Sequence, residues 1–332
     1  MNDTLKRLIA AHSTPGDEGA VAEILRQCWR RSGWKVEDLG KYALTAKKLQ
    51  KTAEKRPRLL ICAHMDSPGF IVDRPGWEEF EGADGSRSVN IVLLGSPSFE
   101  GEAVEARLKC RNGVFSGRII KTNTEEEDNP EFCFEITKDG AEKTDLCIGD
   151  RVCYAPLISS EGDLIKAPFL DNRLGCWMLT QLAELEPGWN QRYEVVLGAA
   201  GSEEMTGFGA QVLAAEVDAD LVIVLDATYE AEEQGVKLGD GAVVTLSDAS
   251  VLLDPVTRDH IMQIMGDAGV PIQFEVYNYS GTDARAFPMQ GRCAPVLALL
   301  VPSRGNHSPC ETVHSTDLQS WERAIKALEA NF

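Results

Sequence analysis

The chain has 332 residues, of which 43% are hydrophobic and 26% are charged, as in an ordinary globular protein with one large core or two domains. Lys and Arg number 33 against 52 for Asp and Glu, which gives a formal net charge of −19. This surplus of carboxylates argues against nucleic acid and anionic membrane surfaces as partners, because both bind basic patches.

The nine cysteines include no pair with the two-residue spacing of a zinc knuckle or redox motif. Several of them lie in apolar runs, where a free thiol behaves as a small hydrophobic residue. The first residues predict an amphipathic helix rather than a signal peptide, and no apolar run approaches the ~18 residues of a membrane span. We therefore expect a reduced, cytoplasmic protein.

The N-terminal part predicts two helices and a strand before the first buried strand. Asp3 and Asp17 are candidate caps of helices whose apolar residues recur at helical spacing. Residues 34–44 predict a strand and a turn, and the cationic stretch 47–58 predicts a solvated hairpin or loop. The continuous apolar run 59–63 is typical of a buried central strand.

Between residues 70 and 163 helical periodicity disappears and short alternating stretches appear. Turn signals separate these stretches, among them Asn112-Gly113, Asp139-Gly140 and the acidic segment 124–128. This pattern of short alternating stretches and turns predicts a small all-β unit, residues 70–163, inserted into an α/β domain formed by residues 1–69 and 164–332.

After residue 163 the α/β pattern resumes, with buried strands alternating with amphipathic helices. Strands are predicted over 195–200, 221–225, 243–246 and 295–301, and helices begin or lie at 171, 212–215, 258–268 and 318–328. The expected fold class is therefore α/β, with a mostly parallel central sheet and an inserted β domain.

Glu203 and Glu204 are adjacent carboxylates between two glycines, just past the apolar run 195–200. Two neighbouring anions repel each other and are costly to desolvate, so a cation is expected near them. Such a pair alone is more often a solvated acidic turn. The other strand ends decide between the two interpretations.

Each of four apolar strands leads to a candidate metal ligand: His64 after 59–63, Glu203 and Glu204 after 195–200, Asp226 after 221–225, and His307 after 296–301. In open α/β sheets the functional crevice lies outside the carboxyl ends of the strands. Asp171, at a helix start, is a further candidate. Alone, each His is more often structural and Asp171 more often a helix cap. Together they indicate a metal centre.

Two imidazoles, two terminal carboxylates and one shared carboxylate form the ligand count of a dinuclear site, with metals ~3.5–4 Å apart. Imidazole and carboxylate ligands suit Zn²⁺, and Co²⁺ or Mn²⁺ less tightly. We therefore expect two divalent metal ions, Zn²⁺ first, in a catalytic rather than a closed structural site, because no thiolates are present.

Seven motifs, in this order along the chain, match one known family: Ala63-His64-Met65-Asp66, Leu170-Asp171-Asn172-Arg173-Leu174-Gly175, Glu203-Glu204-Met205-Thr206-Gly207, Leu225-Asp226-Ala227-Thr228, Val270-Pro271-Ile272-Gln273, Gly281-Thr282-Asp283-Ala284, and residues 302–311. The chain resembles the TET-type dinuclear metallo-aminopeptidases, which include glutamyl and deblocking aminopeptidases.

The resemblance implies roles for individual residues. Asp171 bridges both metals, His64 and Asp226 complete one site, and Glu204 and His307 complete the other. Glu203 is the general base, and Asp66 orients His64. The implied fold is a three-layer α/β catalytic domain with a barrel-like insert, and the insert implies a homo-oligomer.

The implied reaction releases N-terminal residues from small peptides. A water bridging the two cations has its pKa lowered to ~7 and attacks as hydroxide, while Glu203 carries its proton to the departing amine. A related dinuclear deacylase or carboxypeptidase is the alternative enzyme. A non-catalytic, metal-stabilised assembly protein is the alternative outside enzymology.

Overall fold

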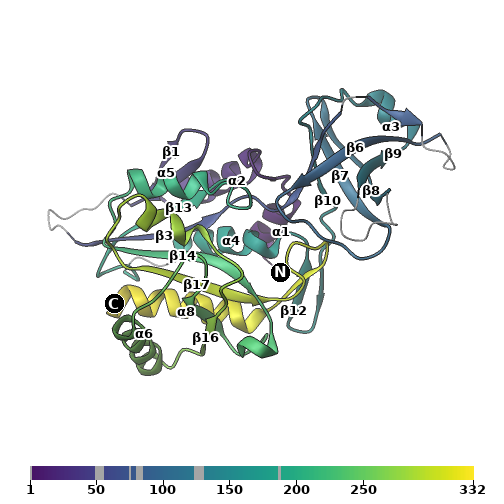
Figure 1. Ribbon diagram of the computed structural model, residues 1–332. Helices are drawn as coiled ribbons and strands as arrows, with labels where there is room; N and C mark the ends of the chain where they lie inside the picture. The colour runs from purple at the N-terminus through teal and green to yellow at the C-terminus, as the bar shows by residue number, and fades with distance from the viewer. Residues whose placement is uncertain (1, 49–55, 75, 80–84, 123–130, 186–187) are drawn as a thin grey trace.

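The computed structural model describes residues 2–48, 56–74, 76–79, 85–122, 131–185 and 188–332. Figure 1 shows an α/β body with a β-barrel standing beside it. The middle of the predicted loop 47–58 and the predicted acidic turn 124–128 lie outside the described residues. No helix in the described ranges is long and apolar enough to cross a membrane.

The α/β body is organised around one mixed eight-stranded sheet. From edge to edge its strands are β1 (Lys35–Leu39), β2 (Ala43–Lys47), β13 (Glu194–Ala200), β3 (Arg58–His64), β14 (Leu221–Tyr229), β17 (Val296–Ser303), β15 (Ala242–Ser247) and β16 (Ile272–Val276). The four middle strands β13, β3, β14 and β17 run parallel to one another. Antiparallel pairs, β2 with β13 and β15 with β17, join them to the strands at both edges. The predicted α/β class is confirmed.

Helices cover both faces of this sheet. Successive residues of β3 point to opposite faces: Leu59 and Ile61 join one core, and Leu60 and Cys62 join the other. The larger core is packed by α1 (Asp3–Ala10), α2 (Gly19–Arg31), α4 (Leu170–Glu184), α6 (Pro255–Ala268) and α8 (Ser315–Asn331), and the smaller by α5 (Phe208–Glu216) and α7 (Ala286–Met289). The result is the expected three-layer body.

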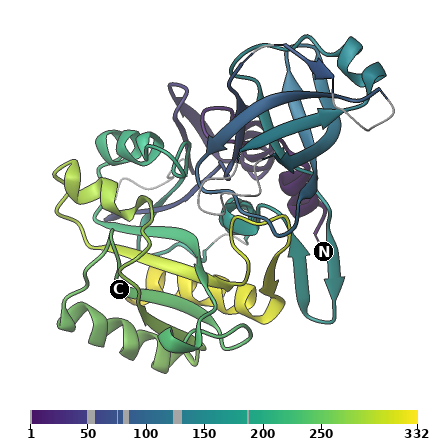
Figure 2. The same ribbon diagram turned by 45° about the vertical axis from the view of Figure 1, so that its right-hand side comes forward.

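Six antiparallel strands close the barrel, because β4 pairs with both β10 and β6. Around the barrel they are β4 (Gly69–Val72), β10 (Arg151–Tyr154), β7 (Ala103–Cys110), β8 (Gly113–Lys121), β9 (Phe132–Ile136) and β6 (Arg87–Leu94), with β5 (Glu78–Glu79) added to β6 and α3 (Lys138–Lys143) after β9. Figure 2 shows the barrel from a second side. Closure leaves few unpaired strand edges.

A small third sheet, of β11 (Ser159–Glu161), β12 (Leu164–Ala167) and β18 (Glu311–His314), lies between the end of the barrel and helix α8. Strand β12 pairs antiparallel with β18, so that Ala167 lies opposite Glu311. This pairing brings the segment before α4 next to the segment after β17.

Two expected helix caps are wrong. The side chain of Asn2, not Asp3, accepts the Thr4 N–H at the start of α1. Asp17 is not a cap of α2, because its carboxylate instead accepts two hydrogen bonds from Lys109 Nζ on the barrel, at 2.6 and 2.7 Å. A contact with a distant strand thus takes over a side chain that local sequence assigns to the helix.

Candidate metal centre

The predicted ligands meet at the carboxyl ends of the parallel strands. His64 is the last residue of β3 and lies opposite Ala200, the last residue of β13, which leads to Glu203 and Glu204. Asp226 lies near the end of β14. His307 follows β17, and Asp171 lies in the first turn of α4. Parallel pairing explains why residues so far apart in sequence share one crevice.

One cluster contains His64, Asp171 and Asp226, all buried. The Nε2 atom of His64 lies 3.3 Å from Asp171 Oδ1 and 3.3 Å from Asp226 Oδ1. The potential ligand atoms of the three residues lie within 4.8 Å of one another. Such a set can hold one metal ion.

A second cluster contains Asp171, Glu204 and His307. The Nε2 atom of His307 lies 3.6 Å from Asp171 Oδ2 and 3.4 Å from Glu204 Oε1. Asp171 therefore presents one carboxylate oxygen to each cluster. Its backbone at this point is not helical, with φ −79° and ψ 108°, although it lies inside α4.

The donor set fits divalent cations. Among the described residues, Asp171 Oδ1 and Glu204 Oε1 are buried and have no hydrogen-bond donor. Buried carboxylate oxygens ordinarily have a hydrogen-bond donor or a cation as partner. The lack of a donor at these two oxygens is therefore consistent with a cation site. Oxygen and imidazole nitrogen without thiolate is a donor set of catalytic zinc sites.

Like charges and burial shift the acidities in this crevice. Burial first, and then the charge of Asp171, raises the pKa of Glu204 to about 8 and that of Asp226 to about 6. Burial, Asp283 and Glu204 raise the pKa of Glu203 well above its usual range. Carboxylates outnumber the imidazoles here, and this excess of negative charge attracts cations.

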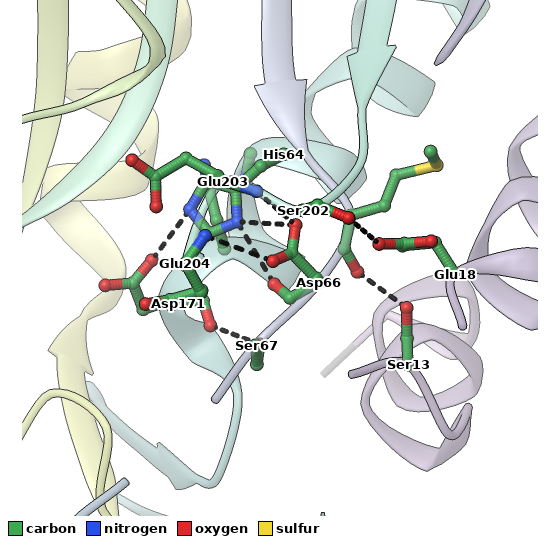
Figure 3. A network of polar contacts seen from close by, with 12 residues as sticks. Ser13, Glu18, His64, Asp66, Ser67, Asp171, Ser202, Glu203 and Glu204 are labelled. Atoms are coloured by element: carbon green, nitrogen blue, oxygen red, sulfur yellow. Dashed lines mark hydrogen bonds and ion pairs between the residues drawn. The ribbon is translucent and has the colours of Figure 1, made fainter. Parts of the chain in front are cut away.

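Asp66 holds the Glu203-Glu204 segment in place (Figure 3). Its fully buried carboxylate accepts the backbone N–H of Glu203 through Oδ1 at 3.1 Å and that of Glu204 through Oδ2 at 3.2 Å. His64 Nδ1 lies 3.1 Å from the backbone oxygen of Asp66 and 3.7 Å from its carboxylate. The side chain of Asp66 thus contacts the acidic loop more closely than the imidazole.

Three non-glycine residues of the described chain have a positive φ, and all flank the crevice: Phe169 (66°), Ser202 (62°) and His307 (65°). Such conformations cost energy and persist where surrounding contacts impose them. Ser202 Oγ donates to Glu18 at 3.1 Å, and Glu18 also accepts the Gly16 N–H, as Figure 3 shows in part.

Glu311 is a site residue that was not predicted from the sequence, although it ends one of the matched motifs. Its side chain, in a residue only 1% exposed, accepts the Asp171 N–H at 2.8 Å and the His307 N–H at 3.0 Å. It therefore joins the backbone of the shared candidate ligand to that of His307. A carboxylate within a strand of otherwise neutral residues was the available signal.

The crevice opens into a cavity of about 300 Å³. Its lining combines the six candidate residues His64, Asp171, Glu203, Glu204, Asp226 and His307 with uncharged side chains, among them three tyrosines. His314 does not line it, because its side chain caps α8 by accepting the Thr316 N–H. Thr282, rather than Asp283, provides the cap of the short helix that follows it.

Comparisons with known proteins agree with this picture. The glutamyl aminopeptidase of Lactococcus lactis is 25% identical, over 97% of this chain and 95% of its own. A TET aminopeptidase from a marine sediment Thaumarchaeota archaeon superposes with a TM-score of 0.86 at 21% identity, covering 98% of this chain and 94% of its own. The TET1 peptidase of Pyrococcus horikoshii gives 0.81 at 22%, covering 98% of both chains. Residues 114–323 match the model of the M42 glutamyl aminopeptidases, and the chain belongs to that family.

Proposed function

We propose that this member of the M42 peptidases is a metal-dependent aminopeptidase that binds two divalent cations and uses Glu203 as its general base. The observation that carries the proposal is the position of Asp171, whose Oδ1 faces His64 and whose Oδ2 faces His307. His64 and Asp226 would complete one site, and Glu204 and His307 the other.

Zn²⁺ suits these ligands, with Co²⁺ or Mn²⁺ as alternatives. When bound, the cations supply an acidified water as nucleophile and polarise the scissile carbonyl. The protein's part is to keep the ligands in register. Because a backbone carbonyl can only accept, His64 Nδ1–H donates to the Asp66 oxygen, which leaves the Nε2 lone pair free to ligate.

Glu203 is suited to moving the proton. Its side chain is 11% exposed, lines the cavity, and is anchored through the Asp66 contact to its backbone N–H. Because its pKa is raised, the Glu203 carboxylate is a stronger base than an ordinary glutamate. It is therefore suited to take a proton from the attacking water and return it to the departing amine. The guanidinium of Arg285 lies beside it, with Nη2 3.9 Å from Glu203 Oε1.

We also propose that residues 70–163 act as an oligomerisation domain on a catalytic domain of 1–69 and 164–332, in a cytoplasmic homo-oligomer. Val92, Leu93 and Val114 of the barrel are 46–51% exposed, which favours contact with another copy. The TET1 peptidase of Pyrococcus horikoshii can assemble into a tetrahedron or a large octahedral shell. All nine cysteines are free, as in a reducing compartment.

A panel of aminoacyl chromogens, each with a free or an acetylated amine, tests the activity. The protein is stripped of metal and reconstituted with Zn²⁺, Co²⁺ or Mn²⁺ in turn, and metal content is measured beside the rate. We expect metal-dependent hydrolysis of the free-amine substrates alone. Release of acetate from the acetylated substrates, without release of chromogen, would instead identify a deacylase, and bound metal without hydrolysis would identify a non-catalytic protein.

A further inference from the structure

We propose that Tyr229, Tyr277 and Tyr279 form the wall that receives the side chain of the substrate's N-terminal residue, and that this wall selects aromatic and large apolar residues over acidic ones. We call these three residues the tyrosine wall. The inference rests on the proposed aminopeptidase function and specifies its substrate class.

The wall begins next to the candidate ligands. Tyr229 ends strand β14, three residues after Asp226. Tyr277 and Tyr279 follow the end of the edge strand β16, and the Tyr277 N–H donates to Ser247 O at 2.8 Å, which fixes the start of this segment. All three tyrosines line the same cavity as the metal ligands.

The rings form a continuous series. The centroids of Tyr229 and Tyr277 lie 6.1 Å apart with their planes at 66°, and those of Tyr277 and Tyr279 lie 5.8 Å apart at 61°. These are edge-to-face contacts, which fix the relative orientation of the rings and leave part of each ring surface available to a substrate side chain. Tyr279 is 91% exposed and Tyr229 37%, so the series runs from the open mouth toward the metal centre.

Apart from the candidate ligands and Glu203, every lining residue is uncharged. The neutral ones besides the tyrosines are Ser96, Ala227, Ser280, Gly281, Thr282, Leu300 and Asn306. Of the nearby arginines, Arg285 lies against Glu203, with Nη2 3.9 Å from its Oε1, and Arg304 pairs with Glu230 at 2.6 Å. An acidic side chain entering the cavity would therefore lose its hydration without gaining a cationic partner from the described lining.

Size and ring chemistry point to the preferred side chain. About 300 Å³ is at the lower end of small-molecule pockets, which fits one large side chain beside a scissile bond. A phenylalanine or leucine side chain gains apolar contact with the rings at no electrostatic cost. A lysine gains cation–π attraction from the rings but has no carboxylate in the tyrosine wall to pair with, so its rate should be intermediate.

The test measures kcat/KM for Phe, Leu, Ala, Lys and Glu chromogens on the metal-reconstituted enzyme. We expect Phe and Leu to lead and Glu to fall at least about 100-fold below Phe, since an unpaired buried charge is strongly rejected. A Glu substrate as fast as Phe would overturn the inference and leave the aminopeptidase function intact. No hydrolysis of any substrate, with bound metal verified, would overturn the proposed function and the inference with it.

A matched pair of variants isolates charge at the wall. Tyr279 is exposed, so Tyr279→Arg and Tyr279→Gln should both fold, as checked by circular dichroism. Both replace the ring with a flexible polar side chain, and only the first adds a cation. We expect Tyr279→Arg to raise the Glu/Phe ratio of kcat/KM at least about 10-fold over Tyr279→Gln. Equal ratios in the two variants would contradict a role of this wall in selection.

A second pair isolates the ring. Tyr277→Phe keeps the aromatic surface and Tyr277→Ala removes it. We expect Tyr277→Ala to lower the Phe/Ala substrate ratio about 10-fold through KM, and Tyr277→Phe to keep that ratio. A Phe/Ala ratio unchanged in Tyr277→Ala would also contradict the assignment. Because each readout is a ratio, a general loss of active protein does not imitate it.

Discussion

Asp66 and Glu203 are joined through the main chain: the Asp66 carboxylate accepts the Glu203 N–H at 3.1 Å, and its other oxygen accepts the Glu204 N–H at 3.2 Å. The two residues are 137 positions apart in sequence. One buried carboxylate thus sets the backbone of both the proposed base and a proposed ligand. It is the structural support on which the geometry of the acidic loop depends.

Substitution of Asp66 should impair the loop without removing a ligand. In Asp66→Asn one oxygen is replaced by an NH₂ group, which faces a backbone N–H and cannot accept its hydrogen bond. We expect metal affinity and kcat each to fall about 10–100-fold, measured by metal titration and steady-state kinetics. Asp73→Asn, at a carboxylate 45% exposed on the barrel side, is the control. Wild-type metal affinity in Asp66→Asn would count against this role.

Glu203→Gln should separate proton transfer from metal binding. Gln cannot accept the proton, so kcat should fall about 10²–10⁴-fold while metal content stays near wild type. Asp171→Asn is the contrasting variant, because a shared ligand serves both sites, and it should lose both metals. Elemental analysis beside the rate checks both. Metal loss in Glu203→Gln would make Glu203 a ligand instead of the base.

Removal of Glu311 should leave the Asp171 and His307 N–H groups without an acceptor. Each buried unpaired group costs about 1–3 kcal/mol, so Glu311→Ala should unfold at lower urea concentration and bind metal more weakly. Glu311→Gln retains one acceptor oxygen and should recover part of both losses. Glu216→Gln, at an exposed position, is the control. Equal behaviour of the Ala and Gln variants would exclude the hydrogen-bond explanation.

His12 should make the stability pH-dependent at the junction of the barrel and the α/β body. His12 is 5% exposed, with Nδ1 3.5 Å from Asp17 Oδ2, and Cys153, Arg107 and Lys109 surround the pair. Burial opposes its protonation, but the charges of Cys153 and Asp17 outweigh burial and raise the pKa of His12 to about 9.

Because this pKa is raised above the unfolded value of about 6.5, the stabilisation is fully present below pH 6.5 and is lost as pH rises through about 9. We expect a contribution of up to about 3 kcal/mol. Urea unfolding of wild type and His12→Gln between pH 6 and 10 measures it. The difference in unfolding free energy should narrow as pH rises, and a constant difference would refute the assignment.

The sequence alone determined the central strands, the α/β class and the family. Buried parallel strands require continuous apolar runs, and ligands at their ends must follow those runs directly. His64 and Asp226 could therefore be predicted as candidate ligands from short local patterns. The alternating stretches between residues 70 and 163 predicted an all-β unit for the same reason, because a half-buried strand has a period of two.

Only the tertiary structure decided which distant groups are in contact. The contact of Glu311 with Asp171 spans 140 positions, and the tyrosine wall joins the end of β14 to the segment after β16. No local pattern records such pairs, since the Glu311 and Tyr277 side chains could equally face solvent or core. The assignment of Asp17 as a cap was wrong for the same reason, because the distant Lys109 bonds its carboxylate. Asp3 was wrong for a local reason, because its neighbour Asn2 provides the cap.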